Sequence, residues 1–145
     1  MSGSRAGGRA VLEDLLASLC ASETAGDFIA RWGSAGPSPR SPRGLRVEPD
    51  DPAISSLEVR PWDGGRVGVV DVELAPAAAP SWDELGAWFG PFVPLPTPPG
   101  GRRLWSASWW RDPLPVDAVI LVPEPEDPGG RVPSLTLRRG RSRPR

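Results

Sequence analysis

The clearest hydrophobic pattern in the chain predicts a short amphipathic helix over residues 81–90. Its apolar residues recur at helical spacing and share one face: Trp82, Leu85, Trp88 and Phe89. Ser81 stands at the N-cap position, and Glu84 follows three residues later, which is the spacing of a capping box. Gly90 and Pro91 then end the helix.

Two more helices are predicted near the start of the chain, over residues 9–22 and 24–33. The first carries a stripe of leucines: Leu12, Leu15, Leu16 and Leu19. The second has a capping Thr24, an Asp27 three residues later and a terminal Gly33. Because amphipathic helices this short are not stable alone, we expect all three to pack on a sheet.

The strands of that sheet are predicted from runs in which apolar and polar residues alternate. The runs are 45–47, 54–61, 66–75, 103–110, 116–123 and 131–139. Glycine pairs at 64–65 and 129–130 supply the positive φ that tight hairpin turns need. The Pro/Gly-rich segments 34–44 and 91–101 are expected to be connectors. The pattern predicts about five or six mostly antiparallel strands.

The order of these features occurs twice, in residues 24–76 and again in residues 81–139. Each half has a hydroxyl-capped helix, a connector, a strand and a hairpin. The tetrapeptide Gly-Gly-Arg-Val stands at both 64–67 and 129–132. We interpret this order as a tandem repeat of helix plus hairpin. Chance is the alternative, since Gly-Gly-Arg also occurs elsewhere in this glycine-rich chain.

The predicted fold is therefore a single α+β domain over residues 9–139. It has two layers, a mostly antiparallel sheet and helices on one of its faces. The N-terminal residues 1–8 and the basic tail 140–145 are expected to be disordered. A length of 145 residues suffices for one domain with a real core.

Composition changes this picture little. The formal net charge is −1, which does not suggest a general nucleic-acid binder. The chain contains no Lys, His, Asn, Gln or Tyr, and all its basic residues are arginines. Such usage is typical of a very GC-rich genome of the actinobacterial kind. The many glycines, prolines and arginines are therefore weak evidence for function.

Several classes of chemistry are excluded by the residue types. Without His and with one Cys, the chain cannot form a Ser-His-Asp or Cys-His catalytic group or a usual zinc site. It has no Gly-Lys pair and hence no Walker loop. The acidic clusters at 48–51 and 124–127 are interpreted as solvated loops rather than cation sites. We expect no metal, no cofactor and no enzymatic activity.

The cysteine count and the hydropathy pattern bear on the compartment. Cys20 is the only cysteine, so no internal disulfide can form. Glu13 and Asp14 interrupt the first apolar segment, which argues against a signal peptide. No apolar run has the length of a membrane span. We therefore expect a cytoplasmic protein without membrane contact.

The most suggestive functional residues are aromatic. Trp105 and Trp109 share one face of the strand 103–110, and Trp110 lies on the other. One helix layer cannot cover both faces, so either the connector 91–99 covers the odd ring or the ring is exposed. Exposed tryptophans beside arginines are typical of interaction hot spots. The candidate partner-binding residues are Trp62, Trp105, Trp109, Trp110, Arg103 and Arg111.

A glycine-terminated helix followed by strands, present twice in residues 24–139, resembles the beta-lactamase inhibitor protein fold and the related small outer-membrane-assembly lipoproteins. The resemblance implies a scaffold that binds other proteins on an exposed, aromatic-rich sheet face. The paired cysteines typical of the secreted inhibitors are absent from this chain. The second group of strands also resembles small immunity proteins of bacterial competition systems.

Two functional hypotheses follow. The first is a non-catalytic module, inhibitor-like or immunity-like, that binds a protein partner. The second is a small-molecule pocket between helices and sheet, cyclase-like or isomerase-like, in which Asp71, Glu73 or Asp117 would serve as acid or base. A homodimer stays open as a third reading, and no nucleic-acid partner is expected.

Overall fold

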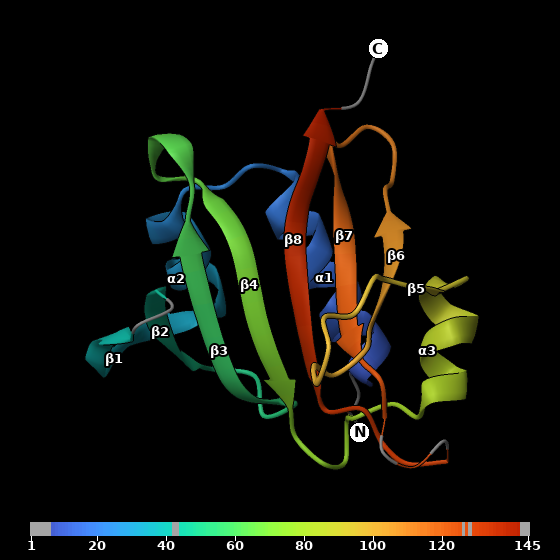
Figure 1. Cartoon of the computed structure of the whole chain (residues 1–145). Coiled ribbons are helices and arrows are strands. Elements are labelled where there is room, and N and C mark those ends of the chain that lie inside the picture. Colours follow the sequence, from blue (N-terminus) through green and yellow to red (C-terminus); the bar gives the residue numbers. More distant parts are fainter. Residues whose placement is uncertain (1–6, 42–43, 126, 128, 143–145) are drawn as a thin grey trace.

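A computed structural model of the chain describes residues 7–41, 44–125, 127 and 129–142. Within these residues, three α-helices accompany one eight-stranded antiparallel sheet, two behind it and one beside its edge (Figure 1). The helices are α1 (Gly8–Cys20), α2 (Ala25–Trp32) and α3 (Trp82–Phe89). The predicted α+β class with a mostly antiparallel sheet is confirmed.

The sheet joins two groups of four strands. The strands are β1 (Gly33–Ser41), β2 (Gly44–Pro49), β3 (Ile54–Pro61), β4 (Val67–Leu74), β5 (Val93–Pro94), β6 (Leu104–Trp109), β7 (Val116–Pro123) and β8 (Ser134–Ser142). Their spatial order is β1-β2-β3-β4-β8-β7-β6-β5. Strands β4 and β8 therefore meet in the middle of the sheet, and β1 and β5 form its edges.

The expected count of five or six strands was too low. The two additional strands, β1 and β5, lie in the segments that we interpreted as connectors. The register of β1 with β2 shifts between Ala35 and Arg40, a stretch whose sequence contains two prolines, and proline is tolerated in a sheet chiefly at an edge. Such strands lack the apolar–polar alternation on which the prediction relied.

The predicted termini differ in part from the structure. Strand β8 runs to Ser142, so residues 140–142 of the expected tail belong to the sheet. Helix α1 begins at Gly8, the last residue of the expected N-terminal disorder. Residues 1–6 and 143–145, which complete these two predictions, lie outside the described residues.

The caps predicted for α2 and α3 are present. The Thr24 hydroxyl accepts a hydrogen bond from the Asp27 backbone N–H at 3.2 Å. In α3 the Ser81 hydroxyl accepts from the Glu84 N–H at 3.1 Å, and the Glu84 carboxylate accepts from the Ser81 N–H at 2.9 Å. These reciprocal bonds form the capping box and satisfy backbone groups that a helix start leaves open.

The hydrophobic core lies between the helices and one face of the sheet. The leucine stripe of α1 is fully buried against β4, β7 and β8. Along β8, Leu135 and Leu137 point into this core, and along β4, Val70 and Val72 do the same. Alternation along the central strands thus sends every second side chain to the helices and the others to the opposite face.

The same kind of local contact occurs once in each half of the chain. Thr24, the N-cap of α2, forms a bridge with Arg66, and Ser81, the N-cap of α3, forms one with Arg131. In the first half the Val67 N–H donates to the Glu23 carbonyl at 2.9 Å. In the second half the Val132 N–H donates to the Pro80 carbonyl at 2.7 Å. The Gly-Gly-Arg-Val segments hence occupy corresponding places.

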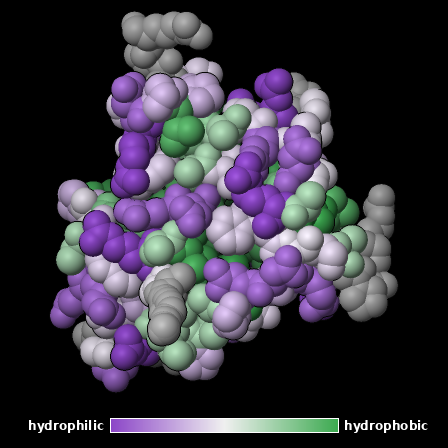
Figure 2. Space-filling model, turned by 180° about the vertical axis from the view of Figure 1, so that it is seen from behind, coloured by the Kyte–Doolittle hydropathy of each residue, from purple (hydrophilic) through white to green (hydrophobic). Residues whose placement is uncertain are grey.

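The outer side of the helix layer is mainly hydrophilic. Seen from that side, hydrophobic residues show mostly in recesses between polar ones (Figure 2). None of the helices in the described part of the chain combines the length and the apolar character needed to cross a lipid bilayer.

Candidate functional site

The candidate site is the sheet face that points away from the helices, which we call the open face. In Figure 1 the strands β3, β4, β8 and β7 lie in front of α1 and α2, with no described helix over them. Side chains on this face are largely polar or charged along β3 and β4, and more apolar along β7. The face spans both halves of the chain.

A polar network holds the centre of the open face. The Arg60 guanidinium on β3 forms an ion pair with Asp71 on β4 at 3.2 Å. The Thr136 hydroxyl on β8 donates to the same carboxylate at 2.8 Å. The Nε–H of Arg60 is buried and has no hydrogen-bond partner among the described residues. Asp71 thereby links side chains of three neighbouring strands, β3, β4 and β8, at the centre of the open face.

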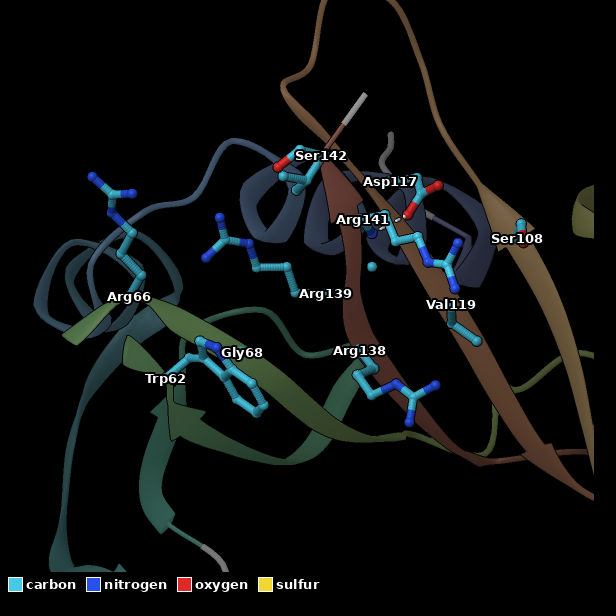
Figure 3. Close-up of a pocket in the computed structure, with 12 residues that line it drawn as sticks. Trp62, Arg66, Gly68, Ser108, Asp117, Val119, Arg138, Arg139, Arg141 and Ser142 are labelled. Atoms are coloured by element: carbon cyan, nitrogen blue, oxygen red, sulfur yellow. Dashed lines mark hydrogen bonds between the residues drawn. The ribbon is translucent and has the colours of Figure 1, made fainter. Parts of the chain in front are cut away.

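One end of the open face contains a hollow of about 840 Å³, which we call the basic hollow (Figure 3). It opens where β4 and β8 diverge beyond the pair Val69–Arg138. Its charged and aromatic lining is Trp62, Arg66, Asp117, Arg138, Arg139 and Arg141. Among the described lining residues, four cations therefore face one carboxylate.

Trp62 forms one wall of the basic hollow. It follows β3 and precedes a tight turn at Asp63–Gly65, and its side chain is 63% exposed. The indole lies against Gly68 of β4, where an added Cβ would stand 2.8 Å from the Trp62 Cβ. The glycine at position 68 thus makes room for the ring, a relation that the sequence alone did not reveal.

The opposite wall depends on an irregularity between β7 and β8. The register shifts between Val116 and Ala118, and the Asp117 carboxylate accepts a hydrogen bond from the Arg141 backbone N–H at 2.7 Å. A Cβ at Gly140 would overlap that carboxylate. This contact fixes Arg141 at the rim of the hollow, beside Val119 (Figure 3). Sequence reasoning missed Arg141 because it placed residues 140–145 in a tail.

The other end of the open face has the opposite charge. A second hollow of about 620 Å³, which we call the acidic hollow, is lined by Glu58, Asp71 and Glu73 together with Arg102. Leu104 and Leu121 add apolar surface to it. The open face is therefore polarised, with arginines at one end and carboxylates at the other.

Two predicted site residues face the helices instead. Trp109 is 8% exposed, and Trp105 packs edge-on against Trp82 of α3 at 5.6 Å. Phe92, from the segment expected to be a cover, packs on the same Trp82 at 5.4 Å. The indole N–H of Trp105 donates to the Glu124 carboxylate at 3.3 Å. Trp105 therefore packs against α3, and Trp109 belongs to the buried core.

The remaining candidates are exposed but do not join the basic hollow's lining. Trp110 is 38% exposed, and its indole N–H donates to the Leu114 carbonyl at 2.8 Å. Arg111 pairs with Glu13 of α1 at 3.3 Å and lies over the Trp109 ring at 5.2 Å. Arg103 is exposed just before β6. The six predicted residues thus do not form one patch, although Arg111 and Trp109 are in contact.

The lone cysteine lies away from the open face, in the core. Burial raises the pKa of the Cys20 thiol to about 12, with the Asp117 charge acting in the same direction and the Arg139 charge opposing it. A thiol of this kind is protonated and unreactive at neutral pH. Among the described side chains, no cluster of His, Cys, Asp or Glu is arranged to hold a metal ion.

Comparisons with protein-family models, with curated proteins and with solved structures gave no match to this chain.

Proposed function

We propose that this protein is a non-catalytic cytoplasmic module, inhibitor-like or immunity-like, that binds a protein partner on the open face. One observation carries the proposal: a sheet face free of described helices displays the exposed Trp62 beside arginines. Tryptophan and arginine are the residue types that most often dominate binding energy in protein interfaces. A lone, buried cysteine is consistent with a reducing compartment.

The size of the open face suits this role. Neighbouring strands are spaced by about 4.8 Å, so an eight-stranded sheet is about 34 Å wide. A standard protein interface buries about 800 Å² on each partner. The central strands alone offer a surface of that order, and their ion pairs hold its polar side chains in place.

The alternative, a carboxylate pocket between helices and sheet, has less support. It required Asp71, Glu73 or Asp117 to point into an apolar cavity. Asp71 instead lies on the open face and is paired with Arg60, and Glu73 is exposed there. Asp117 lines the rim of the basic hollow. We therefore propose no acid–base chemistry and no cofactor.

We further propose that the chain arose as two related halves, 24–76 and 81–139. The support is the pair of corresponding bridges from the N-caps of α2 and α3 to Arg66 and Arg131. Each helix is also followed by four strands, and the two groups meet through their last members, β4 and β8. On this reading the open face is a composite surface to which each half contributes.

A site-specific photocrosslinker tests the proposed function. Position 108 is exposed on the open face, and position 30 is exposed on α2 at the opposite side of the molecule. We expect benzoylphenylalanine at position 108, but not at position 30, to give an adduct of one defined mass in cells that produce the protein naturally. The adduct should weaken when Trp62→Ala is added. Equal adducts from both positions, or none from position 108, would contradict the proposal.

A further inference from the structure

The basic hollow brings like charges together at one end of the open face. Arg66 precedes β4, whereas Arg138, Arg139 and Arg141 come from β8, and Figure 3 shows their guanidinium groups around the hollow. Among the described residues, no carboxylate lies within ion-pair distance of the side chains of Arg66, Arg138 or Arg141. Like charges that line one hollow repel one another, and a bound anion lowers that repulsion.

The chemistry of the lining favours a carboxylate-bearing ligand. A guanidinium presents two parallel N–H donors that match a carboxylate, and Arg66 and Arg138 are exposed and free to turn toward one. Asp117 supplies one negative charge against the four arginines of the lining, and one of its oxygens accepts the Arg141 backbone N–H. The Trp62 indole, beside the arginines, offers an apolar surface to the aliphatic part of a glutamate or a neighbouring side chain.

The rest of the open face argues against a nucleic acid. A phosphate backbone that left the basic hollow along the strands would meet Glu58, Asp71 and Glu73 in the acidic hollow. The formal net charge of −1 also gives no general attraction for a polyanion. A protein segment avoids this conflict, since its acidic residues can be confined to a few positions.

The volume of the hollow is of the right order for a few side chains. At about 840 Å³ it falls within the range of about 300–1,000 Å³ typical of ligand sites. Its lining comes from β4, β6, β7 and β8 and from the turn after β3, so a segment bound there would lie against strands of both halves of the chain.

We infer that the basic hollow binds an acidic segment of the protein partner, with Arg66 and Arg138 pairing with its carboxylates and Trp62 packing beside them. This inference rests on the proposed function, because it names the chemistry of the partner that the open face takes. Binding should weaken as salt is added, since the contacts are charged and partly exposed.

Fluorescence anisotropy with a labelled peptide of eight glutamates tests this inference. Matched probes are a peptide of eight glutamines and a thymidine oligonucleotide of eight nucleotides. We expect the glutamate peptide to bind at low ionic strength at least tenfold more tightly than either. The double variant Arg66→Gln with Arg138→Gln should weaken its binding at least tenfold. Arg9→Gln, an exposed arginine of α1 on the helix side of the sheet, should change it less than twofold.

Three results would overturn the inference: no binding of the glutamate peptide, tighter binding of the oligonucleotide, or equal affinity in the double variant. Unfolding midpoints of all variants serve as the control for folding, and the substituted arginines are exposed. A crosslinked adduct at position 108 together with no binding of the glutamate peptide would refute the inference of an acidic segment and leave the proposed function standing. Loss of both signals would refute the proposed function as well.

Discussion

Neighbouring residues of one strand point to opposite faces of the sheet, and the side chains of the two faces differ in burial and charge. On β8, Leu137 is fully buried under the helices, whereas its neighbour Arg138 is exposed at the basic hollow. On β4, Val72 points to the core and Asp71 to the polar network. The covered face thus holds the buried apolar side chains, and the open face is the surface that we propose for partner binding.

Energetic magnitudes support this division. Burying a leucine side chain contributes about 1.5–3 kcal/mol, and a partly exposed ion pair contributes about 0–1 kcal/mol. The pairs on the open face, Arg60 with Asp71 and Arg46 with Glu58, are of the second kind. Their charges therefore contribute little to the stability of the fold.

The largest effect is expected from Leu137→Ala. This side chain is fully buried between β8 and the helices, so its truncation should lower the free energy of unfolding by about 2–5 kcal/mol. Leu121→Ala, on the open face and half-buried, is the matched control and should cost much less. Urea denaturation compares the two. Similar losses in both variants would show that the open face also belongs to the core.

The pH dependence of stability probes the covered face through Cys20. The thiol pKa is 9.0 without the fold and about 12 in the folded protein, so stability should fall as pH rises from about 9 toward 12. The chain has no Lys or Tyr, so no other side chain titrates in this range. Urea denaturation between pH 8 and pH 11 should show a steeper fall in wild type than in Cys20→Ala. Parallel curves would contradict a buried thiol.

A smaller effect is expected at the helix caps, where the two halves can be compared directly. Ser81→Ala removes the capping box of α3, and Thr24→Ala removes the single cap bond of α2. Each should cost about 1 kcal/mol of unfolding free energy, because a backbone N–H loses its partner. Thermal unfolding of both variants measures this. A cost at one cap only would weaken the correspondence between the halves.

The smallest effect is expected at the centre of the open face. Asp71→Asn keeps the side-chain shape but removes the charge that pairs with Arg60. We expect a loss below about 1 kcal/mol, since the pair is partly exposed. The measurement is the denaturation midpoint, with Asp83→Asn, an exposed residue of α3, as the control. A loss of several kcal/mol would place the network among the main sources of stability.

Sequence reasoning predicted the helices and the central strands, where local signals agree. The capping box at Ser81 and the leucine stripe of α1 each specify an element without tertiary information. The alternation of Val70 and Val72 with Asp71 likewise fixed which residues face the core. Strands β1 and β5 were missed because proline-rich edge strands carry no alternation.

The site was predicted only in part, because it depends on contacts between distant residues. Trp62 was singled out from its place at a turn, but its position over Gly68 required the pairing of β3 with β4. Arg138 and Arg66 lie 72 positions apart and meet only because β4 pairs with β8. Trp105 and Trp109 were grouped by strand periodicity, which cannot tell which face a helix will cover.

The most direct test of the account is to map peptide binding residue by residue. Amide shifts of the ¹⁵N-labelled protein, recorded while the eight-glutamate peptide is added, report which backbone groups sense it. The account predicts shifts concentrated at Trp62, Arg66, Gly68 and Arg138–Arg141 around the basic hollow, with α1 and α2 nearly unchanged. Shifts confined to the outer side of the helices would contradict it, because recognition would then belong to the covered side of the sheet.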